Sequence, residues 1–185
     1  VVTEMKKGTT KLLRPGRSDV VITFGKSEDL ADGTVRYSAV TITGLEESRF
    51  TLTTGTLMTR RRNATEVQPT FFEFSDRVLL TVDDGLRLES DQAAYDDEKR
   101  LLTVPGVVQF SRGRLSGRAV GANYDLERDL VELLKEATAH VAAGAGGKGS
   151  ADASSDRMTL VRGQKMLKMD EHARIDWDGG RWHPP

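Results

Sequence analysis

The sequence predicts an all-β protein built from repeated β-hairpin units. Three observations favour this class. The 185 residues include 18 Thr, 16 Val and 18 Gly, and Thr and Val fit half-buried strands whereas Gly supplies turns. Apolar and polar residues alternate over most of the chain, which is the period of a strand. One segment also recurs after 29 residues, which indicates stacked copies of one supersecondary unit.

The first third of the chain reads as a leading segment followed by strands. Residues 1–34 are mostly polar, with one clear apolar strand at Asp19–Phe24. Alternating apolar residues then predict strands at Val35–Ile42 and Phe50–Leu57. The stretch Thr59–Pro69 carries an arginine run and no apolar pattern, so we expect a solvated loop there.

The clearest hairpin lies near the middle of the chain. Apolar residues alternate with polar ones over Phe72–Val82, and Asp83–Gly85 then marks a tight turn into a second strand that starts at Leu86. The 29-residue repeat begins in this second strand. The repeat pairs Leu86 with Leu115, Ala93 with Ala122, Tyr95 with Tyr124, Asp96 with Asp125, Leu101 with Leu130, and Val104 with Leu133.

Residues 125–141 fit two structures. Their Leu, Ala and Val residues have helical spacing, so the segment alone reads as an amphipathic helix. Its counterpart in the repeat, residues 96–110, contains Pro105 and Gly106, which forbid a long helix. The repeat therefore predicts a turn and a strand, with the helix as the alternative.

The chain is expected to divide into four segments. Residues 1–34 form the leading segment and 35–141 form the main β-domain. Residues 142–156 are rich in Ala, Gly and Ser, which predicts a flexible linker. Residues 157–185 return to strand character and read as a further, truncated β-repeat.

The composition excludes several functional classes. The chain has 27 Lys and Arg against 28 Asp and Glu, and this balance argues against a nucleic-acid module. It has no Cys, which excludes disulfides and thiolate chemistry. No apolar stretch reaches the length of about 18 residues that a membrane helix needs. The chain opens on Val1 with no signal peptide, so we expect a soluble fragment or a mature portion, from which an anchor could have been removed.

No catalytic or metal-binding constellation is found. His140, His172 and His183 lack the spacing of metal ligands, and the acidic run Asp96–Glu98 lacks the Gly and the distal Glu of a calcium loop. The arginine run Arg60–Arg62 reads as a solvated loop rather than a binding site. We therefore expect a protein that is not an enzyme, with no catalytic residue, metal or cofactor.

The candidate site is the inner face of the repeat units. Alternation places one set of apolar residues on this face and charged residues on the other. The inner residues become smaller along the chain, so the interior either leaves room for acyl chains or forms a tapered dry core. The predicted groove residues are Leu86, Leu88, Ala93, Tyr95, Leu102, Val104, Val108, Phe110, Leu115, Ala119, Ala122, Tyr124, Val131, Leu133 and Ala137.

Residues 78–141 resemble the periplasmic lipopolysaccharide-transport family, with its LptC-like and LptA/OstA-like domains. The likeness lies in Leu86–Asp96, its copy Leu115–Asp125 and the spacer Leu101–Val107. A looser likeness starts near residue 35 and a weaker echo runs over Met158–Trp177. The order of units is more similar to LptC than to LptA.

The resemblance implies a β-jellyroll, or folded taco, of two antiparallel sheets around the acyl chains of lipid A. It implies a periplasmic scaffold of Gram-negative envelope biogenesis that takes lipopolysaccharide from an inner-membrane ABC transporter toward the outer membrane. LptC-type members carry an N-terminal membrane helix, which this chain does not contain. An OstA-like bridge protein would join by strand addition, and we expect Phe50–Leu57 and Met158–Trp177 to be the exposed edges.

Two other functions fit the same pattern. A structural β-repeat module with a dry core would bind proteins and no lipid. A carbohydrate-binding β-protein would need exposed aromatic residues, for which Trp177 and Trp182 are the candidates.

Overall fold

The computed structural model describes residues 3–45, 49–61, 63, 65–147, 149–164, 166–178 and 180–182. Its regular structure is antiparallel β-sheet, with one short 3₁₀ turn, η1 (Arg162–Gln164), and no α-helix among these residues. The strands are β1 (Thr3–Leu12), β2 (Val20–Asp29), β3 (Val35–Leu45), β4 (Phe50–Arg60), β5 (Phe71–Val82), β6 (Arg87–Asp96), β7 (Leu101–Arg112), β8 (Leu115–Asp125), β9 (Leu130–Val141), β10 (Ala151–Ser155), β11 (Arg157–Val161), β12 (Met166–Asp170), β13 (Arg174–Trp177) and β14 (Gly180–Trp182).

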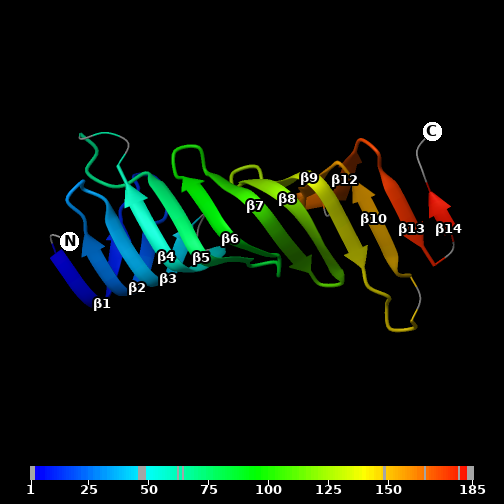
Figure 1. Ribbon diagram of the computed structural model, residues 1–185, viewed down its shortest axis with the longest axis horizontal. Helices are drawn as coiled ribbons and strands as arrows, with labels where there is room; N and C mark the ends of the chain where they lie inside the picture. Colours follow the sequence, from blue (N-terminus) through cyan, green and yellow to red (C-terminus); the bar gives the residue numbers. More distant parts are fainter. Residues whose placement is uncertain are drawn as a thin grey trace.

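The strands follow one another in chain order across one sheet. From β1 to β10, each strand pairs with the next one in the chain. Beyond β10 the sheet continues with β13 and β14. The molecule is therefore elongated, with the two chain ends at opposite ends of its long axis (Figure 1). The predicted all-β class is confirmed, and residues 130–141 form strand β9 rather than a helix.

Most of the long strands bend near their middle, and the bends form a line that we call the fold line. The register shifts in all five consecutive strand pairs from β4/β5 to β8/β9. Such shifts are β-bulges, which bend a strand. Non-glycine residues with positive φ lie at the same level, namely Ala39, Asp76, Arg77 and Glu136. The sheet therefore folds along this line into two leaves.

Two rows of cross-strand neighbours define the leaves. The first leaf contains the inner row Ile22, Ile42, Leu52, Leu80, Leu88, Phe110, Gly117, Ala139, Ala153 and Ile175. The second leaf contains the inner row Thr59, Phe72, Tyr95, Leu102, Tyr124, Val131, Leu160 and Leu167. Phe50 of the first leaf meets Tyr124 of the second edge to face, with ring centroids 5.6 Å apart, so the two inner faces pack against each other.

Beyond β9 the two leaves have separate strands. One half of β9 pairs with β10, through Ala137–Val141, and the other half pairs with β11, through Leu130–Leu133. β10 then continues to β13 and β14 in the first leaf, whereas β11 continues to β12 in the second. The C-terminal end of the molecule is thus two short leaves rather than one bent sheet.

The structure corrects the predicted edges. Phe50–Leu57 lies in β4, a central strand paired with β3 and β5, so it is not an edge. The edge at this end is β1, which the sequence did not show because its residues are mostly polar and exposed. At the other end, β12 and β14 are the outermost strands of the described chain. The predicted edge Met158–Trp177 is therefore right for β12, whereas β11 and β13 each have a neighbour on both sides. The predicted linker is also shorter than expected, because Ala151–Ser155 forms β10.

A glycine in β8 allows close packing of the inner face. The Phe110 ring lies on its cross-strand neighbour Gly117. A Cβ atom on Gly117 would lie 2.3 Å from the Phe110 ring and 2.2 Å from the Thr138 carbonyl oxygen. The ring therefore fills the space that a side chain at residue 117 would occupy.

We predict that Gly117→Ala destabilises the protein by about 1–3 kcal/mol, because the added methyl group overpacks the interior and displaces backbone. Gly106→Ala is the matched control, since a Cβ atom there meets nothing within 4 Å. Urea unfolding measures both. Equal stability of the two variants would contradict the packing described here.

Candidate functional site

The predicted groove residues come together in one hydrophobic interior. Fourteen of the fifteen are buried, with 5% or less of their surface exposed, and Leu115 is partly buried against them. The residues of both repeat copies lie on the inner faces of the leaves, as the alternation predicted. Along the middle of the molecule these side chains fill the space between the leaves.

The C-terminal end of this interior is less closed. There Leu167 and Met169 of β12 and Ala153 of β10 are only partly buried against the core. Ile175 of β13 is half-buried and Trp177 is 45% exposed. We call this set of five inner-facing residues the C-terminal mouth. Apolar side chains thus continue past the packed middle to a partly open end.

A surface groove of about 630 Å³ lies elsewhere, on the outer face of the first leaf. Outward-facing polar side chains line it, among them Arg118, Thr138, His140 and Asp152. Phe110, Ala139 and Ala153 also contribute to its lining, so it adjoins the predicted groove residues from the outer side, but most of its lining is polar.

The long side opposite the fold line, where the turns of the two leaves meet, is held by buried ionic contacts. We call this side the seam. At its C-terminal part, Arg162 is buried, with 2% of its side chain exposed. It binds Asp84 at 2.8 Å, in the β5–β6 turn of the first leaf, and also Asp129 and the Tyr124 hydroxyl in the second leaf.

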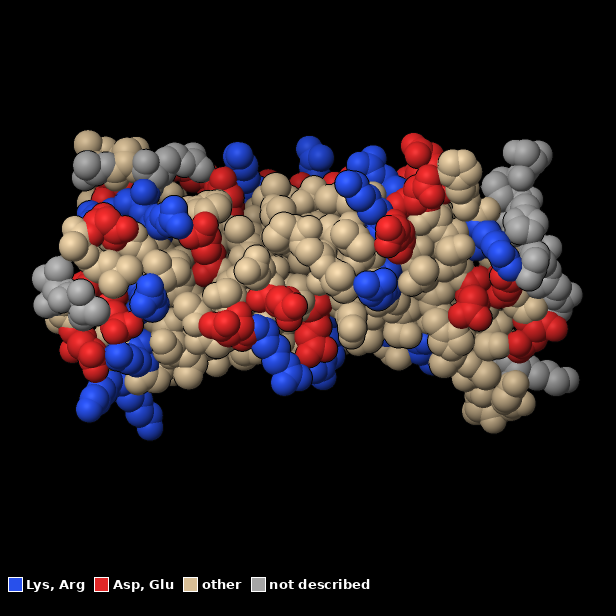
Figure 2. Space-filling model, viewed as in Figure 1, with Lys and Arg blue, Asp and Glu red and all other residues tan. Residues whose placement is uncertain are grey.

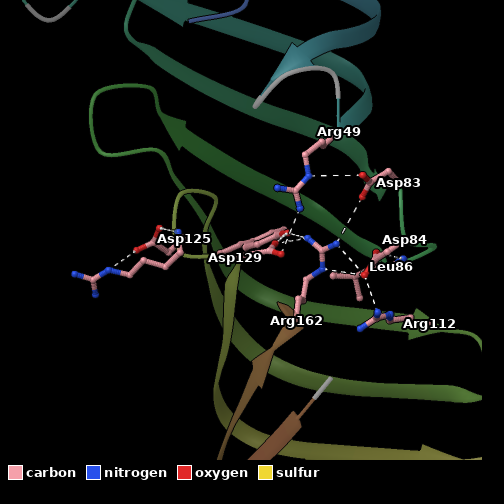
Figure 3. A network of polar contacts seen from close by, with 10 residues as sticks. Arg49, Asp83, Asp84, Leu86, Arg112, Asp125, Asp129 and Arg162 are labelled. Carbon is pink, nitrogen blue, oxygen red and sulfur yellow. Dashed lines mark hydrogen bonds and ion pairs between the residues drawn. The ribbon is translucent and has the colours of Figure 1, made fainter. Parts of the chain in front are cut away.

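Further arginines extend this network. Arg112 binds Asp84 at 2.9 Å. Arg49, which precedes β4 in the first leaf, lies 3.4 Å from Asp129 of the second leaf and 3.6 Å from Asp83. The network therefore joins the two leaves through more than one contact (Figure 3). We call Arg49, Asp84, Tyr124, Asp129 and Arg162 the C-terminal latch.

Protonation states in this latch follow from burial and partners. Burial opposes the charged form of Asp84, but hydrogen bonds from Arg162 and from the Leu86 N–H outweigh it and hold the pKa of Asp84 below its ordinary value. Burial, with Asp129 nearby, raises the pKa of the Tyr124 phenol. The phenol therefore stays protonated and donates to Asp129 at 2.8 Å.

A second ionic cluster holds the N-terminal part of the seam. Arg14, which follows β1, binds Asp97 at 2.8 Å, and Arg17 binds the same carboxylate at 2.7 Å. The Arg14 guanidinium also donates to the Ser18 carbonyl at 2.7 Å. The Tyr95 hydroxyl lies 3.2 Å from Asp97. We call Arg14, Arg17, Tyr95 and Asp97 the N-terminal latch.

The two latches share one feature of the sequence repeat. Tyr95 and Tyr124 are equivalent residues 29 apart in the sequence. The phenol of Tyr95 contacts Asp97, and that of Tyr124 contacts Asp129. The sequence placed both tyrosines on the inner face but did not reveal the role of their hydroxyl groups. It also gave no signal for Arg14 or Arg162, because their partners are distant in the chain.

Groups of side chains such as His, Asp and Glu hold metal ions in proteins. Among the described residues, no group of three or more His, Asp or Glu side chains is placed to hold a metal ion. His140 pairs with Asp152 and His172 pairs with Asp156, both at 2.7 Å on the surface. His183 and Arg62 lie outside the described residues, as does the Trp182 side chain. Within the described chain, no helix is long and apolar enough to cross a membrane.

The surface charges are mixed. On the face shown in Figure 2, Lys and Arg lie interspersed with Asp and Glu, and neither sign gathers in one large patch. Nucleic-acid sites are usually strongly basic surfaces. This face therefore gives no support to nucleic-acid binding, in line with the nearly neutral composition.

These features define the fold as an open, LptA-like β-jellyroll. It is similar to the solved structure of LptH, the LptA homologous periplasmic component of the lipopolysaccharide transport device from Pseudomonas aeruginosa. The TM-score is 0.51 with 8% sequence identity, over 66% of this chain and 82% of that one. No known protein family matches the sequence, and no curated protein matches it. The likeness supports the fold, while the LptC-like assignment stays a prediction.

We predict that Asp84→Asn lowers the free energy of unfolding by about 1–3 kcal/mol at pH 7, because it removes a charged partner of Arg162. The pKa of Asp84 is lowered by folding, so its contribution is complete above the unfolded value of about 3.9 and is lost as the pH falls through the folded value. The deficit of Asp84→Asn should therefore shrink below about pH 4.

Urea unfolding between pH 2 and pH 7 measures this dependence. Asp91→Asn, at an exposed residue of β6, is the control and should match the wild type at pH 7. A deficit of Asp84→Asn that stays constant down to pH 2 would show that Asp84 does not stabilise the seam through its charge.

Proposed function

We propose that this protein is a non-enzymatic lipid-transport scaffold that holds the acyl chains of lipopolysaccharide between its two leaves. One observation carries the proposal: the apolar interior continues into the C-terminal mouth, where its inner-facing side chains are only partly covered. The likeness in fold to a periplasmic lipopolysaccharide-transport component supports the same role.

The two faces of the mouth differ sharply in character. On β12, Leu167 and Met169 face inward, opposite Leu160 and Met158 of β11, whereas Lys168 faces outward. On β13, Ile175 faces inward beside Ala153. The next residue, Asp176, lies opposite Asp152 of β10 on the outer face. An acyl chain at the mouth would therefore meet apolar atoms inside, with polar residues toward water.

The energetics of this arrangement favour an acyl chain. Each CH₂ group removed from water contributes about 0.8 kcal/mol. Methionine side chains are flexible and adapt to irregular apolar partners, which suits Met158 and Met169. No covalent step is involved, so the protein needs neither a catalytic residue nor a cofactor.

The partners would join at the ends of the sheet. β1 at one end and β12 and β14 at the other leave main-chain groups without a neighbouring strand in the described chain, and such edges accept a strand from another protein. We propose that an inner-membrane ABC transporter and an OstA-like bridge protein are these neighbours. This assignment places the protein in the periplasm, in an LptC-like role.

A second candidate is a structural β-repeat module that binds proteins and no lipid. The packed middle of the molecule favours it, because Ile22, Leu52 and Ala137 have no exposed surface. The two functions make opposite predictions for lipid that accompanies the purified protein.

We predict that the wild-type protein, expressed in the envelope of a Gram-negative host, co-purifies with lipopolysaccharide detectable by native mass spectrometry. Leu167→Asp and Met169→Asp should each reduce the bound lipid at least tenfold, because a carboxylate at the mouth opposes burial of an acyl chain. Both residues are only partly buried, so the variants should remain folded.

Lys168→Asp is the matched control, since it lies between these residues on the opposite face of β12. It should keep the wild-type amount of lipid. If the wild type carries no lipid under these conditions, the transport proposal is wrong and the structural module becomes the favoured function. If all three variants carry equal lipid, the mouth is not where acyl chains bind.

A further inference from the structure

We propose that the two arginine latches keep the seam closed, and that opening them parts the leaves and exposes the interior along the side of the molecule. The use of such an opening for lipid rests on the proposed function. The latches themselves rest on the contacts between the leaves.

Each latch connects one leaf to the other. In the C-terminal latch, Arg162 follows β11 of the second leaf and binds Asp84 in a turn of the first leaf at 2.8 Å. In the N-terminal latch the direction is reversed, because Arg14 follows β1 at the first leaf and binds Asp97 beyond β6 of the second leaf at 2.8 Å. The seam is thus held near both halves of the molecule.

The main-chain hydrogen bonds between the turns at the seam differ from the latch contacts, because each of them stays within one leaf. The Asp83 N–H donates to the Arg49 carbonyl within the first leaf. The Asp97 N–H donates to Thr70, and the Leu126 N–H donates to Arg100, both within the second leaf. These bonds tie neighbouring turns of the same leaf, so the leaves can part at the seam without breaking them.

A cleft beside the N-terminal latch shows where parting would begin. It has a volume of about 190 Å³ and is lined by Leu12 and Val20 from the first leaf and by Pro69 and Phe72 from the second. Arg14, Arg17 and Asp97 also line it. Val20 and Phe72 belong to the buried core, so the cleft leads from the surface to the interior and the latch lies beside it.

The chemistry of the latches suits a reversible closure. A buried ion pair contributes little net stability compared with well-packed apolar groups, because desolvation offsets the attraction between the charges. Its geometry is nevertheless specific, since a planar guanidinium binds a carboxylate through directed hydrogen bonds. Asp84 and Asp129 keep 24% and 22% of their side chains exposed, so water can reach the carboxylates as the seam opens.

The absence of cysteine allows a direct test in the full chain. Val20→Cys places one thiol beside the N-terminal latch, and Val131→Cys places one beside Tyr124 of the C-terminal latch. Both valines are buried, with 2% and 1% exposed, so labelling by a maleimide under native conditions reports opening. Each thiol is combined in turn with Arg14→Met, Arg162→Met or the control Arg77→Met.

Arg162→Met should accelerate labelling of Val131→Cys at least tenfold and leave Val20→Cys within about twofold of the parent protein. Arg14→Met should show the reverse. Arg77→Met should change neither, because Arg77 is 83% exposed and pairs with Glu89 on the outer surface. Equal acceleration of both thiols by either latch variant would indicate global unfolding and overturn the proposal, as would no acceleration.

If Arg162→Met does not fold, Arg162→Lys takes its place. Lysine keeps the charge but has no planar fork with which to bind Asp84, Asp129 and Tyr124 together. It should still accelerate labelling of Val131→Cys, and a rate equal to that of the parent would overturn the latch.

Labelling needs no lipid, so it separates the latch from the proposed function. If the protein labels as expected but carries no lipid, the latch proposal stands and the transport proposal is wrong. If the protein carries lipid but neither latch variant changes its labelling rate, the transport proposal stands and the latch proposal is wrong.

Discussion

The structure depends on one constraint: a single sheet with one apolar face must cover that face with itself. The long strands satisfy this constraint because they bend at the fold line. The two halves of each long strand then belong to opposite leaves. Three features follow from this bend. The middle is packed, the end strands β1, β12 and β14 have no neighbour on one side within the described residues, and the long side opposite the bend becomes a seam. The ionic contacts of Arg14 and Arg162 occur at this seam, where the two leaves meet without a shared strand.

Much of the interior was predictable because the side-chain period of a strand is two. Alternation alone placed Leu88, Val104 and Leu133 on the inner face, where they are buried. The repeat also resolved the ambiguity over residues 125–141. The segment has helical spacing by itself, but strand pairing of Leu133 with Ala122 on one side and Met158 on the other determines its structure. Tertiary pairing overrides weak helix propensity in such a case.

The remaining features were not predictable for physical reasons. The fold line uses non-glycine residues with positive φ, such as Asp76 and Arg77, which nothing in a hydrophobic pattern marks. Edge strand β1 escaped notice because a strand with little buried surface has little reason to alternate. The latches join residues far apart in the chain, for example Arg14 and Asp97, which are separated by 83 residues. The shrinking inner residues left open whether the interior is an acyl-chain groove or a dry core, and at Gly117 the Phe110 ring occupies the space that a side chain would fill.

The central claim is that acyl chains bind on the inner face of the C-terminal mouth. The most direct measurement is photo-crosslinking in intact cells, with a photoreactive amino acid at Met169 on the inner face or at Lys168 on the outer face of the same strand. The account predicts that the probe at residue 169 forms a covalent adduct with lipopolysaccharide and that the probe at residue 168 does not. Adducts from both residues in equal amount, or from residue 168 alone, would contradict it.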